Sequence, residues 1–182
     1  LVAIATESGK HAQIALDAMD YGCNLIIEKP IALSLEDADK IRNFVFMGLT
    51  RERQAYFFHN YWNPIQKASN YEVTSLIYSY LKLHYKPDIN FKNVYFEFKD
   101  FMEDKNISTE ELLKNILAYA KLYGHILHGT TSDTDLNDSF IRLHKLSARG
   151  VRSYFLKLLR LQEEGIFSLK MVKNIVLTLE HH

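Results

Sequence analysis

Apolar residues follow two different patterns along the chain, and the change falls near residue 40. Residues 1–5 form a short continuous apolar run, which is typical of a buried parallel strand, and Asn24-Leu25-Ile26-Ile27 is a second predicted strand. Between these two segments, apolar positions recur at helical spacing over residues 11–21. A strand, a helix and a second strand joined by short loops predict a parallel crossover unit in residues 1–40.

Beyond residue 40 the apolar spacing is helical as far as residue 180. It predicts seven amphipathic helices with short polar connections, which is the pattern of an all-α bundle. We therefore predict a mainly α protein, a multi-helix bundle with a short N-terminal α/β (strand-helix-strand) fragment. The predicted helices extend from Thr50 to Trp62, from Val73 to His84, from Val94 to Met102, from Ser108 to Tyr123, from Leu136 to a stop near Gly150, from Tyr154 to Gly165, and from Ser168 to Leu179.

Aromatic side chains are frequent on the apolar stripes, and their helical spacing indicates a core. In the first predicted helix, one stripe holds Ala55, Phe58, Tyr61, Trp62 and Ile65. Trp62 is the expected anchor of this core. Pro64 is expected to end the helix, because the residue before a proline is biased away from helical backbone angles.

The composition is that of a folded domain. The 182 residues are 47% hydrophobic and 24% charged, which is enough to bury a core. No apolar run approaches the roughly 20 residues of a membrane span, and no signal peptide is expected. The single cysteine, Cys23, excludes an internal disulfide and favours a cytoplasmic location. The terminal His181 and His182 resemble the start of a purification tag and are excluded as metal ligands.

The net charge is zero, but the charges are unevenly spread. Residues 1–40 hold seven acidic and three basic residues, whereas residues 41–182 hold 15 acidic and 19 basic. Basic residues gather between Phe140 and Lys173, which predicts contact with an anionic partner such as DNA. A solvated helix face is the alternative explanation. The candidate nucleic-acid contacts, named the cationic set below, are Arg142, Lys145, Arg149, Arg152, Lys157 and Arg160.

The first forty residues carry motifs that resemble the Gfo/Idh/MocA family of NAD(P)-dependent oxidoreductases. The matching segments are Ala5-Thr6-Glu7-Ser8-Gly9-Lys10-His11, Glu28-Lys29-Pro30 and Ala32-Leu33-Ser34. The resemblance implies cofactor-binding roles for Thr6, His11, Glu28 and Lys29, with Lys29 beside the nicotinamide and the substrate. A lysine at that place can hydrogen-bond a nascent alkoxide or shuttle its proton. No Gly-x-Gly-x-x-Gly turn precedes these residues, so we interpret them as the remnant of an incomplete NAD(P) site.

Residues 38–180 show a second resemblance, carried by the order of apolar and aromatic positions. They look like the helical region of the ParB/sulfiredoxin-like family of GmrSD-type restriction proteins, whose nuclease or nucleotide-handling motifs would lie N-terminal to it. The two resemblances divide the chain into a partial Rossmann-like fragment (1–40), an all-α helical domain (41–180) and a tag remnant (181–182). The segments that carry the second resemblance are Ile41-Arg42-Asn43-Phe44-Val45-Phe46-Met47, Tyr61-Trp62-Asn63-Pro64-Ile65, Tyr95-Phe96-Glu97-Phe98-Lys99 and Leu117-Ala118-Tyr119-Ala120-Lys121-Leu122-Tyr123.

No other motif assigns a chemistry. His125 and His128 could share a helix face near Asp133 and Asp135, but this spacing matches no known metal-site pattern, so no metal is predicted. Walker, Gly-x-Ser-x-Gly and His-Glu-x-x-His motifs do not occur, and enzymatic activity of this chain is left open.

Three functional hypotheses follow from the sequence. The first is a helical, non-catalytic domain of a bacterial DNA-processing protein of the restriction (defence) type, which needs no cofactor. Its expected partners are DNA, a missing N-terminal catalytic domain or another subunit, and no membrane. The second is a fragment of an NAD(P)-dependent sugar oxidoreductase. The third is a purely structural or oligomerisation module.

Overall fold

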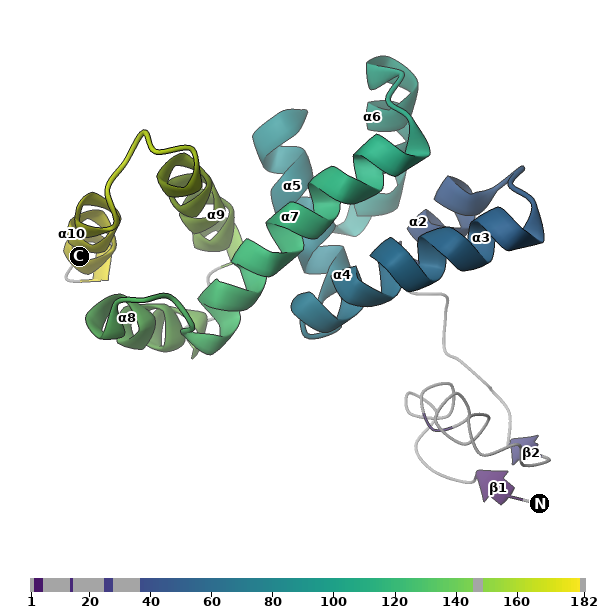
Figure 1. The fold of residues 1–182 in the computed structure, drawn as a ribbon, viewed down its shortest axis with the longest axis horizontal. Helices are drawn as coiled ribbons and strands as arrows, with labels where there is room; N and C mark the ends of the chain where they lie inside the picture. Colours follow the sequence, from purple (N-terminus) through teal and green to yellow (C-terminus); the bar gives the residue numbers. More distant parts are fainter. Residues whose placement is uncertain (1, 5–13, 15–24, 28–36, 146–148, 181–182) are drawn as a thin grey trace. The chain divides into compact units, whose positions relative to one another are not determined.

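The structure is a computed structural model, and it describes residues 2–4, 14, 25–27, 37–145 and 149–180 (Figure 1). The chain divides into two compact units, Leu1–Asp39 and Lys40–His182. The described residues are predominantly helical, which confirms the predicted mainly α fold class.

The N-terminal unit contains a pair of parallel strands. Strand β1 (Val2–Ile4) pairs with β2 (Leu25–Ile27), with Val2 opposite Leu25 and Ile4 opposite Ile27. A parallel pair requires a crossover connection between its strands, as the sequence predicts. Within the predicted crossover helix, Ile14 is helical, and the other residues of that prediction lie outside the described part of the chain.

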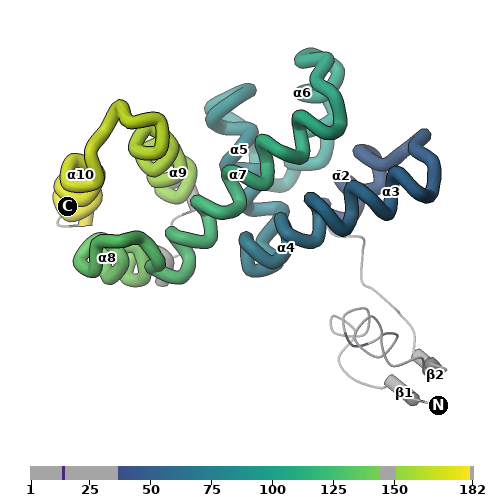
Figure 2. Tube along the Cα trace, viewed as in Figure 1, coloured from purple at the N-terminus to yellow at the C-terminus, as the bar shows by residue number. Residues whose placement is uncertain are grey.

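The helical unit is built around α7, which contacts α4, α5, α8 and α9. Figure 2 shows α8, α9 and α10 grouped near the C-terminal end of α7, where α10 contacts both α8 and α9. Each of the seven helices predicted after residue 49 is found in the described residues. The elements are α2 (Asp37–Phe46), α3 (Arg51–Phe57), the π-helical turn η1 (Phe58–Trp62), α4 (Asn63–Ala68), α5 (Val73–His84), the short 3₁₀ turn η2 (Phe91–Asn93), α6 (Val94–Lys105), α7 (Thr109–His128), α8 (Thr134–Lys145), α9 (Arg149–Glu163) and α10 (Leu169–Glu180).

Hydroxyl side chains cap the N-termini of three of these helices, at the residues predicted from the sequence. Thr50, Ser108 and Ser168 each accept a hydrogen bond from the backbone N–H three residues later, at 3.2–3.4 Å. Such caps satisfy first-turn N–H groups that have no partner inside the helix. The predicted stop near Gly150 is wrong, because Gly150 is the second residue of α9. Glycine lowers helix stability by only about 1 kcal/mol relative to alanine, through backbone entropy, so a glycine alone does not end a helix that is held by tertiary packing.

The predicted end of the first helix at Pro64 is also wrong. The helix continues from α3 through η1 into α4, and Pro64 lies in the first turn of α4. In η1 the Asn63 N–H bonds to the Phe58 carbonyl five residues earlier, so the turn is wider than an α-helical turn. We attribute the tolerance of Pro64 to this wider turn, because in a regular α-helix a proline ring clashes with the carbonyl four residues before it.

The π-helical turn also changes which side chains face the core. Trp62 and Ile65 are fully buried, as predicted, and the Trp62 ring lies 6.2 Å from that of Phe46 on α2. Phe57 is buried in the place predicted for Phe58, which is only half-buried, and Ala55 is exposed. The extra residue in the turn shifts the helical register, because each added residue rotates the following positions by about 100°.

Candidate functional site

A buried guanidinium joins three segments of the helical unit. The Arg152 side chain on α9 is 11% exposed, and its Nη1 donates to Glu72 Oε2 at 2.7 Å and to the Tyr123 hydroxyl at 2.8 Å. The Tyr123 hydroxyl in turn donates to Glu72 Oε2 at 3.0 Å. Glu72 immediately precedes α5, and Tyr123 is on α7. We name these three residues the Arg152 network.

The Tyr123 phenol remains a hydrogen-bond donor at any physiological pH. Burial raises the pKa of Tyr123 to about 12, since the low dielectric disfavours the phenolate. The Arg152 guanidinium opposes this increase and the Glu72 carboxylate adds to it. The neutral phenol links the guanidinium to the carboxylate: Arg152 Nη1, the Tyr123 hydroxyl and Glu72 Oε2 are each hydrogen-bonded to the other two, which is the arrangement of a structural network.

Two further arginines of the cationic set are also paired. Arg142 on α8 binds Glu180 on α10, with Nη2 2.9 Å from Oε2, and the Ser139 hydroxyl donates to the same carboxylate at 2.7 Å. Arg160 on α9 donates to the carboxylates of Glu163 and Glu164 at 3.1 and 2.9 Å. Carboxylates within the helical unit thus pair with two arginines that the sequence-based prediction assigned to contact with DNA.

Of the three remaining members of the cationic set, the structure describes the side chain of one. Lys157 is exposed on α9, and the side chains of Lys145 and Arg149 lie outside the described ones. Contact of the set with nucleic acid therefore stays a prediction. Its described arginines serve as links between helices or within α9, which the basic residues alone could not reveal, because their partners Glu72 and Glu180 are distant in sequence.

His84 lies in a cationic environment on α5. Its ring is 4.5 Å from that of Tyr80 and 5.0 Å from that of Tyr119, and it lines a pocket of about 380 Å³ together with Lys105 and Glu111. Burial lowers the pKa of His84 below its usual range, and the positive charges of Lys157, Arg160 and Lys105 lower it further. His84 is therefore more often neutral in the folded protein than in the unfolded chain.

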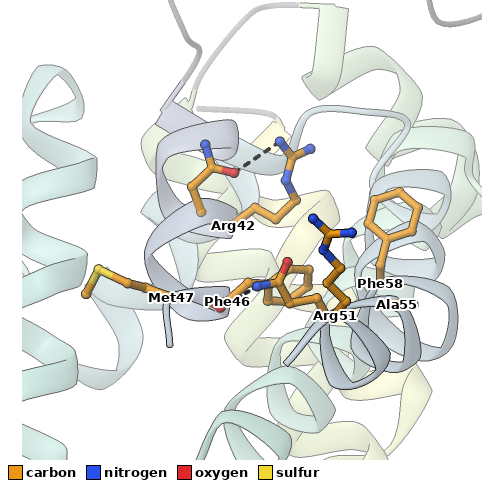
Figure 3. A pocket seen from close by; sticks show the side chains of 8 residues that line it. Arg42, Phe46, Met47, Arg51, Ala55 and Phe58 are labelled. Atoms are coloured by element: carbon orange, nitrogen blue, oxygen red, sulfur yellow. Dashed lines mark hydrogen bonds between the residues drawn. The ribbon is translucent and has the colours of Figure 1, made fainter. Parts of the chain in front are cut away.

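A larger open pocket, of about 470 Å³, lies between α2 and α3 (Figure 3). The guanidinium groups of Arg42 and Arg51 line it, together with the rings of Phe46 and Phe58 and the methyl group of Ala55. Arg42 donates to Asn43 Oδ1 at 3.3 Å, the bond drawn in Figure 3. We name this the α2–α3 pocket. No sequence motif marks this pocket, although the spacing of Arg51, Ala55 and Phe58 at i, i+4 and i+7 places them on one helix face.

Three of the four residues considered for a metal, His125, Asp133 and Asp135, are engaged otherwise. His125 Nδ1 lies 2.8 Å from the Thr130 hydroxyl, and Lys173 pairs with Asp133 at 3.2 Å and with Asp135. Within the described ranges, no group of three or more His, Cys, Asp or Glu side chains could hold a metal ion. Nor is any helix in those ranges long and apolar enough to cross a membrane.

The candidate cofactor residues Thr6, His11, Glu28 and Lys29 lie outside the described residues. Their assignment therefore rests on sequence.

Comparison with known proteins gives one match. The model of the Gfo/Idh/MocA family, described as an oxidoreductase family with an NAD-binding Rossmann fold, matches residues 1–46. No curated protein and no solved structure matches the chain. The comparisons give no support to the resemblance of residues 38–180 to the ParB/sulfiredoxin-like family. The match ends at Phe46, the last residue of α2 and six residues beyond the predicted boundary, so the chain carries at its N-terminus a segment similar to part of an NAD-binding oxidoreductase domain.

Proposed function

We propose that the helical unit is a non-catalytic, architectural module of a larger DNA-processing protein of the restriction type, acting in the cytoplasm. The family assignment rests on the sequence resemblance of residues 38–180, and the cytoplasmic location on the single cysteine. The architectural role rests on the Arg152 network. It uses charged side chains between helices, where they fix the positions of α5, α7 and α9.

The chemistry of the network favours this role over DNA contact. A guanidinium that is 11% exposed cannot reach a DNA phosphate without leaving its partners. Removing it would leave the Glu72 carboxylate without its countercharge, which is costly in a partly buried place. The Arg142–Glu180 pair connects α8 with α10 in the same way, so both arginines contribute to the shape of the module.

Large apolar side chains on the surface suggest where such a module meets its partner. Met47, Phe96 and Ile166 are 72%, 65% and 61% exposed. The partner would be a catalytic domain of the same larger protein or another subunit. Light scattering of the purified chain tests whether that other subunit is a second copy of this chain. Association through a second copy predicts a dimer whose amount depends on concentration.

Duplex DNA binding tests the architectural role. We would titrate the full chain against a fluorescent duplex at about 50 and 200 mM salt, since phosphate contacts weaken steeply over that range. Arg142→Gln and Arg152→Gln should lower the melting temperature and leave duplex affinity within about twofold of that of the wild type. The matched control is Lys157→Gln, an exposed lysine of α9. Duplex affinity that falls in Arg142→Gln at an unchanged melting temperature would contradict the proposal.

A second candidate function is suggested by the family match at residues 1–46. A chain with a working NAD(P) site should enhance and saturate NADH fluorescence at micromolar concentrations. Lys29→Gln should then weaken substrate turnover, because that lysine is placed by the resemblance beside the nicotinamide. An absence of saturable NADH binding would exclude this function for the chain.

A further inference from the structure

The α2–α3 pocket is formed by two helix faces of similar character. On α3 and η1, Arg51, Ala55 and Phe58 follow one another along the same face. On α2, Arg42 and Phe46 are one turn apart and face the same pocket. Each face thus pairs one guanidinium with one aromatic ring, and the small side chain of Ala55 leaves space between them.

The register shift at η1 makes this pocket possible. A regular α-helix with the predicted stripe would have buried Ala55 and Phe58 together with Trp62. In the structure Phe57 occupies the core, whereas Phe58 is half-buried and its ring faces the pocket (Figure 3). A π-helical turn inside a longer helix frequently marks a functional site, and here it presents an aromatic ring to solvent.

The charge of the pocket has one sign. Its lining residues include two arginines, the half-buried Arg42 and the exposed Arg51, and none of the lining residues is a carboxylate. The neighbouring polar side chain, Gln54, donates its amide hydrogens to the carbonyls of Phe46 and Leu49, which ties α3 to the end of α2. The two arginines are therefore presented from helices that are fixed to each other.

We propose that the α2–α3 pocket binds a nucleotide unit, with its phosphate between Arg42 and Arg51 and its base against the Phe58 ring. Guanidinium groups match phosphate oxygens in geometry and charge. An aromatic ring stacks on any base, since every base has a π-face. A volume of about 470 Å³ lies within the range of small-ligand sites. The site does not depend on the architectural role, which uses different arginines.

Two sources can supply this ligand: a free mononucleotide or a nucleotide within a single strand. We would measure the binding of AMP to the full chain by calorimetry. We would also measure the binding of a fluorescein-labelled thymidylate 12-mer by polarisation at two salt concentrations. Binding of AMP alone assigns the pocket to a free nucleotide. Binding of the strand, with affinity that decreases as salt increases, assigns it to single-stranded nucleic acid.

Variants locate the binding in this pocket. Arg51→Gln should weaken whichever probe binds by at least about tenfold, since it removes a charge-assisted contact with phosphate. Ala55→Phe should abolish binding by filling the space, and the exposure of Ala55 means that the core is not disturbed. Arg53→Gln is the matched control, because Arg53 is exposed on the same helix and its guanidinium lies 5.6 Å from the Phe57 ring, outside the pocket lining.

The same experiment can overturn the proposal. It fails if neither probe binds at low salt. It also fails if Arg51→Gln and Ala55→Phe bind as the wild type does while circular dichroism shows both folded. NADH binding that depends on Lys29 and is unchanged in Arg51→Gln would belong to the N-terminal segment and would not support this pocket.

Discussion

Replacing Arg152 by methionine should destabilise the helical unit through one identifiable loss. Methionine keeps much of the length of the arginine stem, so packing between α9 and α7 changes little. It removes the two hydrogen bonds that Nη1 donates, at 2.7 Å to Glu72 and at 2.8 Å to Tyr123. The Glu72 carboxylate then keeps the bond from the Tyr123 hydroxyl but loses its countercharge.

The size of the effect follows from burial. Removing one partner of a fully buried ion pair costs about 3–5 kcal/mol. The Glu72 side chain is 33% exposed, so water recovers part of its solvation and the expected cost is lower, about 2–3 kcal/mol. At about 2–4 °C per kcal/mol for a domain of this size, the melting temperature should fall by roughly 5–10 °C.

Urea denaturation followed by tryptophan fluorescence measures this loss. The chain has one tryptophan, Trp62, which is fully buried in the helical unit and therefore reports its unfolding. A double-mutant cycle with Glu72→Gln should give a coupling energy above about 1 kcal/mol, as expected for residues in one network. Lys157→Met, on the exposed side of α9, is the control and should change the unfolding free energy by less than about 0.5 kcal/mol. An Arg152→Met variant as stable as this control would refute the reasoning.

Three further predictions concern packing, pH and a helix pair. Gly124→Ala should destabilise the unit by about 1–3 kcal/mol in the same urea assay, because a Cβ there would lie 2.6 Å from the Ala68 carbonyl oxygen of α4. An unchanged stability would mean that α4 and α7 separate easily. The pKa of His84 is lowered in the folded state, so the unfolded chain binds its proton more readily. The contribution of neutral His84 to the stability of the folded state is fully present above about pH 6.5 and is lost as pH falls toward the folded-state pKa. His84→Gln should remove this part of the pH dependence of the melting temperature. Arg142→Gln and Glu180→Gln should each speed amide exchange in α10 while lowering the melting temperature only slightly, because the Arg142 side chain is 54% exposed and the pair is partly screened. Equal exchange in wild type and variants would show that the pair does not hold α10.

Helix bounds and caps that depend on residues close together in the sequence were predicted correctly. The helix over Val73–His84 has the predicted bounds, and Thr50, Ser108 and Ser168 cap the helices that the sequence assigned to them. Helical periodicity and capping depend on residues three or four positions apart, so they can be read along a chain.

The sequence did not show where charged side chains find their partners. Arg152 bonds residues 80 and 29 positions away, so its pairing required the arrangement of α5, α7 and α9. The basic pattern of residues 140–173 could therefore suggest an anion-binding surface, and only the assembled helices showed that Arg142 and Arg152 are paired with carboxylates of other segments. Arg160 pairs with carboxylates three and four residues later on its own helix.

By itself, the sequence determined the helical fold class, the helix starts capped by Thr50, Ser108 and Ser168, and the similarity of residues 1–46 to an oxidoreductase segment. The tertiary structure decided that Phe57 rather than Phe58 enters the core, and that Arg42 and Arg51 meet at one pocket. The physical reason is that hydrophobic spacing sets a local conformation, whereas the register of a π-helical turn and the convergence of two helix faces depend on contacts between segments distant in sequence.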